Sequence, residues 1–361
     1  MNGGPASSGL ASHHERERAE ANSVFAIDVG GTWVRAARWS QERGIDQTVR
    51  YRTPSLTNFP AADPAALVEA LAEQIAQLPP KGNRVSVGIS LGAAVDHRSG
   101  RIYGSAPLWG AGTSDVPLLQ LIKKKRPDVR WTIINDVTAM LLAYYHRHPE
   151  FRGQKLLLTT VSTGIASRTL DLTSGDVPLD GAGLQGEIGH VPATTEDDLH
   201  LMCACGEPDH VAAYASGPGI RNVASAVLTK RTSNLLPAMG LSSASPESNF
   251  EVALASALAS GDSAAVNVLR IATQPLADAF TSALTLDPTI DRLVLTGGVI
   301  DSIGTAYRSA LLRRMLARGM YYTAIHHSEW VADRVVLAAT NEASAIVGAG
   351  LTASKASSEQ S

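Results

Sequence analysis

Ser23-Val-Phe-Ala-Ile-Asp-Val-Gly-Gly-Thr32 is the stretch of sequence that decides the fold. A short apolar run leads through Asp28 to the glycine pair Gly30-Gly31, and a second apolar run resumes from Trp33 to Trp39. This pattern predicts a β-hairpin that turns on the two glycines. Glycines also let a backbone approach a phosphate closely and point its N–H groups at it. A plain hairpin turn and a phosphate-binding turn are both open at this point.

Two further glycine turns follow buried strands. Residues 155–161 and 166–171 form a second strand, turn, strand pattern around Ser162-Thr163-Gly164-Ile165. Leu295-Thr296-Gly297-Gly298-Val299 adds a third turn after another apolar run. Each of these turns alone is weak evidence for phosphate binding, whereas the three in order are stronger evidence.

Helical and strand patterns alternate between and after these turns. The remaining helices are expected at 65–78, 137–145, 249–260, 263–286, 305–318 and 342–351, and the strands at 84–90, 131–135, 292–296 and 335–339. Two halves that each open with a glycine-turn hairpin predict a duplicated α/β fold with a cleft between two lobes. We expect an N-terminal lobe at 24–138, a C-terminal lobe at 139–351 whose last helix packs back on the first lobe, and disordered tails at 1–23 and 352–361.

Composition excludes several classes of protein. The chain has 361 residues, 44% of them hydrophobic and 18% charged, which is typical of a folded protein of about two domains. Its net charge of -3 argues against a nucleic-acid partner, and the basic run 123–126 is interpreted as the solvated end of a helix. No apolar stretch is long enough to span a membrane or to act as a secretory signal, so a cytoplasmic location is expected.

Asn135-Asp136 lies between a predicted strand and a predicted helix. An Asp in this position is commonly a helix N-cap. The alternative is a general base, because a carboxylate in a cleft can accept the proton of a hydroxyl that attacks a γ-phosphate. The position of Asp136 at a strand end, at the junction between the two halves, favours the role of a general base.

The two cysteines of the chain, Cys203 and Cys205, are too close together to staple a fold. His190 and His210 lie nearby in the sequence, and thiolates with imidazoles suit tetrahedral zinc. These four residues are therefore predicted zinc ligands. His200 is a competing ligand, and a pair of buried thiols with unrelated histidines is the alternative.

Six motifs in this order resemble the signatures of the ROK family of sugar kinases, within the hexokinase/actin-like superfamily. They are Asp28-Val-Gly-Gly-Thr32, Asn135-Asp136, Ser162-Thr-Gly-Ile165, Gly186-Glu-Ile-Gly-His190, Cys203-x-Cys-Gly206 and Leu295-Thr-Gly-Gly-Val299. The resemblance runs from about residue 24 to Gly348-Ala349-Gly350 and covers nearly all of the predicted folded chain.

The resemblance implies two actin-like (ribonuclease H-like) lobes that close over ATP and a sugar-like polyol, and lobe closure would exclude water. Asp136 would be the catalytic base, and Asp28 would act near Mg²⁺ through water. The residues implied to bind substrate are Asn135, Glu187, His190 and Gly92, those implied to bind ATP or its phosphates are Gly30, Gly31, Thr32, Thr163, Gly164, Gly297 and Gly298, and a structural Zn²⁺ site would brace His190.

Three departures from the family pattern bear on the substrate. His210 stands where the family usually has a third cysteine, so a Cys2His2 site would replace Cys3His. Ala212 stands where the family usually has a glutamate that binds sugar hydroxyls, and an unpaired buried hydroxyl there would cost about 1–3 kcal/mol. The segment Ser105–Gly110 only loosely matches a family segment near the sugar.

These departures favour a substrate that is altered around the ring. Kinases of C7-cyclitols occur among ROK relatives in aminocyclitol natural-product biosynthesis, so the resemblance implies a C7-cyclitol such as valienone, validone or 2-epi-5-epi-valiolone, phosphorylated on its hydroxymethyl oxygen. The alternative is a glucokinase or other hexose 6-kinase that compensates for Ala212 through Glu207 or water. The retained Asp136 argues against a non-catalytic sugar sensor. The 27 residues before Asp28 are too few for the DNA-binding domain that a ROK repressor would carry there. A homodimer is expected by analogy with the family.

Overall fold

The predicted hairpin is formed by β1 (Val24–Val29) and β2 (Trp33–Ser40), which pair antiparallel and close the turn by pairing Val29 with Val34. The computed structural model describes residues 23–81, 85–110, 112–171, 175, 177–178, 186–229, 250–319, 326–327 and 329–358. The predicted tail 1–23 lies outside these residues, apart from Ser23. The described chain divides into a first unit, residues 23–147 and 344–358, and a second unit, from residue 148 to 343.

The first unit is built on a five-stranded sheet in the order β3-β2-β1-β4-β7. The three further strands are β3 (Gly44–Arg52), β4 (Ser86–Leu91) and β7 (Arg130–Asn135). β3 pairs antiparallel with β2, whereas β4 pairs in parallel with both β1 and β7. A small hairpin of β5 (Ala94–Asp96) and β6 (Arg101–Gly104) follows β4.

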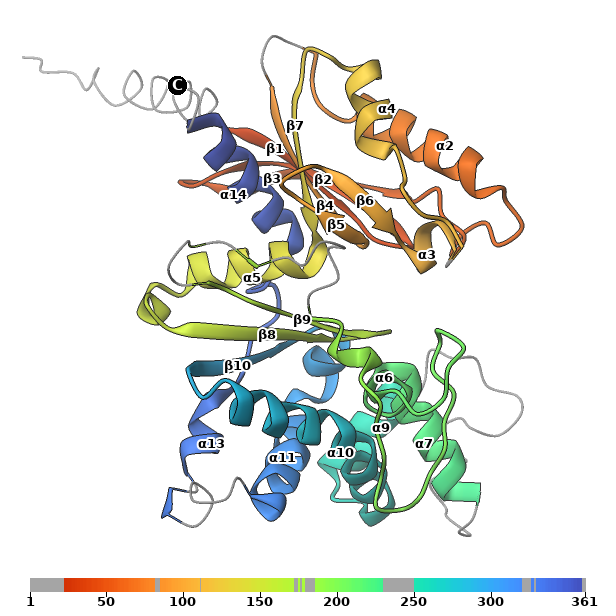
Figure 1. The fold of residues 1–361 in the computed structure, drawn as a ribbon, viewed down its shortest axis with the longest axis vertical. Coiled ribbons are helices and arrows are strands. Elements are labelled where there is room, and N and C mark those ends of the chain that lie inside the picture. The colour runs from red at the N-terminus through yellow and green to blue at the C-terminus, as the bar shows by residue number, and fades with distance from the viewer. Residues whose placement is uncertain are drawn as a thin grey trace, which may run out of the picture. The chain divides into compact units, whose positions relative to one another are not determined.

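Helices lie on both faces of this sheet (Figure 1). One side carries α2 (Pro64–Gln77), α3 (Ala106–Trp109) and α4 (Leu118–Lys125), and the other carries α5 (Asp136–Arg147) and α14 (Ala345–Ser358). α2 begins where the Asp63 carboxylate accepts a hydrogen bond from the N–H of Ala66, and its apolar residues recur at helical spacing, so that one face enters the core. The lysines of the basic run 123–126 are exposed at the end of α4, and Lys125 pairs with Glu73, as expected of a solvated helix end. Arg126 differs from this expectation, because it is half-buried and donates hydrogen bonds to the carbonyl oxygens of Ala76, Pro79 and Pro80.

The C-terminal helix corrects the expected disordered tail at 352–361, because α14 continues to Ser358. Ala353 is 1% exposed and packs with Ala37 and Trp39 of the sheet, and this burial keeps the last turns helical. Gly88 on β4 makes the approach possible, since a Cβ there would lie 1.9 Å from the Ala349 carbonyl oxygen. The boundary between the units also falls later than the expected one after 138, because α5 packs against α14 within the first unit.

The second unit repeats the arrangement in a four-stranded sheet, order β11-β10-β8-β9. β8 (Lys155–Val161) pairs antiparallel with β9 (Ile165–Thr169) and in parallel with β10 (Ile290–Thr296), which pairs in parallel with β11 (Val335–Leu337). In each unit, the first strand of an antiparallel hairpin therefore also pairs in parallel with a strand on its other side. The predicted duplication of an α/β pattern is confirmed.

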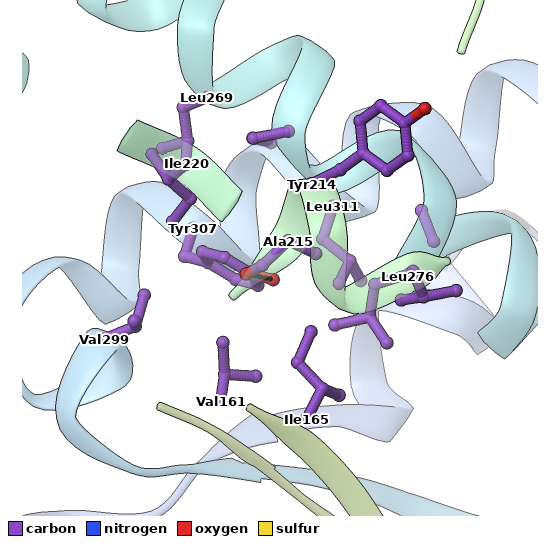
Figure 2. Packing of buried hydrophobic residues seen from close by; sticks show 14 of the residues in the cluster. Val161, Ile165, Tyr214, Ala215, Ile220, Leu269, Leu276, Val299, Tyr307 and Leu311 are labelled. Atoms are coloured by element: carbon purple, nitrogen blue, oxygen red, sulfur yellow. Dashed lines mark hydrogen bonds between the residues drawn. The ribbon is translucent and has the colours of Figure 1, made fainter. Parts of the chain in front are cut away.

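Helices of the second unit pack on the sheet face that carries Val161 and Ile165 (Figure 2). The described helices are α6 (Val211–Ala215), α7 (Gly217–Thr229), α9 (Phe250–Ala259), α10 (Ser263–Leu286), α11 (Gly298–Arg318), α13 (Glu329–Arg334) and the short η1 (Pro149–Phe151) and η2 (Ile188–His190). Tyr214 and Tyr307 are fully buried in this core, and the Tyr307 hydroxyl donates a hydrogen bond to the Ala215 carbonyl oxygen at 3.0 Å.

The helix expected at 305–318 begins earlier, at Gly298, and contains a kink at Ile303. This places a helix N-terminus directly after the third glycine turn. Among the described helices none alone has the length and apolar character of a membrane span; α9 and α10 meet that test only jointly, across a bend of 113°.

Candidate active site

Asp28 is a buried carboxylate at the end of β1 and is 4% exposed. Its Oδ1 accepts a hydrogen bond from the Ser90 hydroxyl at 2.9 Å, and its Oδ2 lies 2.7 Å from Nη2 of Arg35. Burial raises the pKa of Asp28 above its ordinary value, and the Arg35 charge opposes this rise. The ion pair therefore compensates part of the cost of burying the carboxylate.

The turn Gly30–Thr32 is held by its carbonyl oxygens. Thr53 Oγ1 donates to the first of them at 2.8 Å, Ser55 Oγ to the second at 2.5 Å, and Asn58 Nδ2 to the third at 2.9 Å. Among the described residues, none accepts a hydrogen bond from the N–H groups of the last two residues of the turn. Successive free N–H groups in a fixed turn suit an anion such as a phosphate.

Asn135, and not Asp136, is the main cap of helix α5. The Asn135 Oδ1 accepts hydrogen bonds from the N–H groups of Val137 and Thr138, at 3.0 and 3.1 Å. Its Nδ2 donates to the Ala93 carbonyl oxygen and to Asp136 Oδ1, both at 2.9 Å. The N-cap interpretation of Asp136 is thus replaced by a carboxylate that its neighbour orients.

Gly92 faces the second oxygen of this carboxylate. A Cβ built on Gly92 would lie 3.5 Å from Asp136 Oδ2, so the missing side chain leaves room beside that atom. The Ser105 hydroxyl donates to the Gly92 carbonyl oxygen at 2.6 Å, and a Cβ on Gly31 would lie 3.3 Å from Pro107 Cβ. The segment 105–110 therefore lies against both the carboxyl end of strand β4 and the first glycine turn.

In the second unit, two helix N-termini meet the turn Ser162–Gly164. The Ser162 carbonyl oxygen accepts a hydrogen bond from the N–H of Gly217, the first residue of α7, at 2.8 Å. Gly297 precedes α11 with a φ of +105°, and a Cβ there would lie 2.6 Å from the Val161 carbonyl oxygen, so only glycine fits. Thr163 and Gly164 are exposed at the tip of this turn.

Glu187 and His190 are presented by a segment that packs closely on β9. The Gly186 carbonyl oxygen accepts a hydrogen bond from the N–H of Ser167 at 2.7 Å, and a Cβ on Gly189 would lie 2.2 Å from the Ile165 carbonyl oxygen. The Glu187 side chain is 39% exposed. Burial raises the pKa of Glu187, while the charges of Arg168 and His190 oppose this rise.

The four predicted metal ligands come together. One potential ligand atom from each of His190, Cys203, Cys205 and His210 lies within 4.8 Å of all the others. Cys205 Sγ is 3.2 Å from His210 Nδ1, and Cys203 Sγ is 4.0 Å from His190 Nδ1. Two sulfurs and two imidazoles at such separations could hold a tetrahedral Zn²⁺.

His200, the competing ligand, lies outside this cluster. Its Nδ1 is 2.8 Å from the Asp209 carboxylate, and the side chain is 71% exposed. The hydrogen bond to Asp209 raises the pKa of His200. His200 therefore pairs with Asp209 and does not join the cluster of potential metal ligands.

A cavity of about 750 Å³ lies in the second unit along the first turns of α11. Side chains of α9, α11, the end of β11 and the segment after it line the cavity; most are apolar or small, and the polar ones include Asp301 and Thr340. The Thr340 hydroxyl donates to Asp301 Oδ1 at 2.9 Å. Sequence reasoning missed both this cavity and Gly217; Ser216-Gly217-Pro218-Gly219 is the signal that marks the helix start.

Each unit thus collects its own set of predicted residues. The first unit holds Asp28, Gly30, Gly31, Thr32, Gly92, Asn135 and Asp136, and the second holds Thr163, Gly164, Glu187, His190, Cys203, Cys205, His210, Gly297 and Gly298. A family model of the ROK family matches residues 24–356. The chain belongs to the ROK family.

Known relatives agree with this assignment. A 2-epi-5-epi-valiolone 7-kinase from an Actinoplanes species is 42% identical over 341 residues, covering 93% of this chain and 94% of the relative. A C(7)-cyclitol 7-kinase from Streptomyces hygroscopicus subsp. jinggangensis is 28% identical, covering 82% and 85%. A ROK family glucokinase from Streptomyces griseus matches in structure with a TM-score of 0.68 at 20% identity, covering 92% of this ROK chain and 99% of its own. The resemblance and the kinase class predicted from the sequence are confirmed, and the glucokinase confirms the fold class.

The Asp28–Arg35 pair generates a stability prediction. Because burial raises the pKa of Asp28 above 3.8, ionisation of this group costs stability as the pH rises through the raised pKa. Arg35→Gln raises that pKa further, so we expect a loss of about 1–2 kcal/mol at pH 8 that shrinks as the pH is lowered towards 4. The loss is smaller than for a fully buried pair because the Arg35 side chain is 55% exposed. Thermal melts across this pH range measure it.

Asp28→Asn/Arg35→Gln is the matched control, since it removes the buried charge together with its partner. We expect the double variant to recover most of the stability at pH 8. A single-variant loss that is independent of pH would contradict the assignment of the effect to Asp28.

Proposed function

We propose that this ROK protein is an ATP-dependent kinase that transfers the γ-phosphoryl group of ATP to the 7-hydroxyl of a C7-cyclitol, with 2-epi-5-epi-valiolone as the best candidate. The observation that carries the proposal is the 42% identity with a 2-epi-5-epi-valiolone 7-kinase over 94% of that relative's length. The N-acetylmannosamine kinases that match are about 30% identical but cover only about 55% of this chain. Sequence similarity therefore favours the cyclitol over a hexosamine.

In this proposal Asp136 is the general base. The cyclitol hydroxyl would attack the γ-phosphorus while its proton passes to the Asp136 carboxylate, and ADP would leave. Two observations support the role: Asn135 fixes Oδ1 through a hydrogen bond at 2.9 Å, and Gly92 leaves space beside Oδ2. A carboxylate oriented in this way needs little reorganisation when the hydroxyl binds.

The two glycine turns would hold the phosphates of ATP. The turn Gly30–Thr32 in the first unit and Thr163-Gly164 in the second each expose backbone to an anion, and Gly297-Gly298 places the N-terminus of α11 beside the second turn. Mg²⁺ bound with ATP would neutralise phosphate charge. Both Asp28 oxygens already have protein partners, which fits an indirect role through water.

The cavity along α11 is suited to the nucleoside of ATP. It begins at Ile300, two residues after Gly298, and its apolar walls fit a flat base, while Asp301 and Thr340 offer polar atoms to a ribose or base. A volume of about 750 Å³ is within the usual range for a small-molecule site.

Glu187 and His190 would bind hydroxyls of the cyclitol. Ala212 offers only a methyl group where ROK sugar kinases commonly carry a glutamate, which fits a ring that presents no hydroxyl there. Valienone and validone share the C7 skeleton and are the nearest alternative substrates. A glucokinase activity is the other alternative, and the similarity to glucokinase structures at 20% identity supports the fold but not that substrate.

We further propose that His190, Cys203, Cys205 and His210 bind a structural Zn²⁺. A histidine that binds metal through Nδ1 keeps its Nε2–H as a donor, and the metal fixes the plane of the ring. His190 could therefore brace the site and meet a substrate hydroxyl at once. The homodimer and the cytoplasmic location stay predictions.

The substrate proposal is tested by steady-state kinetics with ATP and purified protein. We expect kcat/KM for 2-epi-5-epi-valiolone to exceed that for glucose by about ten- to a hundredfold, because a sugar hydroxyl left without a hydrogen-bond partner at Ala212 costs about 1–3 kcal/mol. Phosphorylation is located on the product by ³¹P–¹H NMR. A tenfold preference for glucose would make the protein a hexose kinase.

The base is tested by Asp136→Asn. The amide cannot accept the hydroxyl proton, so kcat is expected to fall by about 10²- to 10⁴-fold with little change in either KM. Asp115→Asn is the control, because Asp115 is an exposed partner of Arg101 and is expected to keep full activity. Undiminished turnover by the Asp136 variant would remove the carboxylate from the chemistry.

The metal site is tested by elemental analysis of the purified protein. We expect about one zinc per chain, and a strong loss of zinc in Cys205→Ser and in His210→Ala because each removes one of four ligands. His200→Ala is the matched control and is expected to retain zinc, since His200 is paired with Asp209. Zinc-free protein with all four ligands intact would argue for a metal-independent cluster.

A further inference from the structure

Arg168 is a charged residue in the interior of the second unit. It lies on β9, opposite Leu158 of β8, and is 1% exposed. Because a guanidinium stays charged under all ordinary conditions, its burial is costly unless nearby groups compensate for it. The position of this charge therefore calls for a specific reason.

The Arg168 guanidinium packs against the backbone of the segment that carries Glu187. Its Nη1 donates a hydrogen bond to the Ser167 carbonyl oxygen at 2.7 Å, and Nη2 lies 3.8 Å from Glu187 Oε1. A Cβ on Gly186 would lie 3.0 Å from Nη1, so the arginine packs against backbone where a side chain would otherwise stand. The hydrogen bond from the Ser167 N–H to the Gly186 carbonyl oxygen fixes this backbone to β9.

Comparison with a second buried arginine separates two kinds of ion pair. Arg314 is 9% exposed and binds both oxygens of Asp278, at 2.9 and 2.8 Å, which is the bidentate geometry of a structural pair. The Arg168–Glu187 separation of 3.8 Å is longer, and the Glu187 side chain is 39% exposed. The buried Arg168 charge thus attracts the Glu187 carboxylate. Because the Glu187 side chain is partly exposed, it can still accept hydrogen bonds from a ligand.

We propose that Arg168 is a positioning residue that holds the Glu187 carboxylate in the orientation that binds the polyol substrate. The inference rests on the proposed function, in which Glu187 contacts substrate hydroxyls. Arg168 is buried next to the Glu187 carboxylate, so it would affect binding of the polyol through Glu187. The positive charge also opposes the rise in pKa that burial causes at Glu187.

The test combines single variants with a double-mutant cycle in the full-length protein. Arg168→Met keeps an unbranched stem like that of arginine and removes the charged guanidinium group. We expect the KM for the cyclitol to rise about 10- to 100-fold, while the KM for ATP and kcat change by no more than about threefold. Glu187→Gln is expected to raise the same KM to a similar extent. Because both act on one interaction, the double variant should be no worse than Glu187→Gln by more than about threefold.

Conservative replacement and a matched control separate positioning from folding. Arg168→Lys retains the charge without the planar fork, so it should recover part of the affinity and raise the KM by only about 3- to 10-fold. Arg314→Met is the control: it removes an arginine of similar burial, and it should lower the melting temperature and leave the cyclitol KM within about twofold. If Arg168→Met does not fold, by circular dichroism, Arg168→Lys carries the test alone.

Three results would overturn the inference. These are a cyclitol KM within twofold of the wild type in a folded Arg168 variant, equal increases in the KM values for cyclitol and ATP, and losses that multiply in the double variant. Turnover of the cyclitol by the wild-type protein is measured independently, so the kinase proposal can stand when the Arg168 inference fails. A Glu187→Gln variant with wild-type affinity would remove Glu187 from substrate binding and overturn the role of Arg168 with it.

Discussion

Parallel pairing of the central strands is the constraint on which the rest of the structure depends. In the first unit, Val29 of β1 pairs with Leu91 of β4, and Leu91 in turn pairs with Asn135 of β7. The carboxyl ends of three strands therefore stop at the same edge of the sheet. The glycine turn, Gly92 and the Asn135-Asp136 pair each follow one of these ends, which is why residues far apart in the sequence become neighbours. In the second unit, pairing of Thr160 with Thr296 brings the second and third glycine turns together in the same way.

The local features of the fold were predictable from the sequence, because they depend on short-range patterns. The two hairpins, the helix at Pro64–Gln77 and the cluster of two histidines and two cysteines follow from apolar runs, turn residues and ligand chemistry. The family motifs predicted which residues gather at the strand ends. Motif order also carried the fold class, since four of the six motifs mark the end of a strand.

The features that were missed depend on contacts distant in the chain. The last turns of α14 looked like a disordered tail because their small residues gain stability only against Ala37 and Trp39. Gly217 shows its importance only when α7 meets the Ser162 turn. Arg168 is an ordinary arginine in the sequence, and its burial under Glu187 appears only once β9 is paired. That Asn135 is the main cap of helix α5 likewise needed coordinates, because the side chains of Asn135 and Asp136 can both accept hydrogen bonds from N–H groups at a helix start.

The first unit is assembled from both ends of the described chain, and α14 covers the sheet face formed by Val24, Ala26, Ala37 and Trp39. Because α14 follows β1 and β2 only after the residues of the second unit, synthesis exposes this apolar sheet face before the helix that covers it has been made. The second unit is formed by residues that all precede α14 in the chain. We therefore expect this apolar surface of the first sheet to stay uncovered during synthesis until α14 is available, and transiently exposed apolar surface of this kind is prone to aggregation.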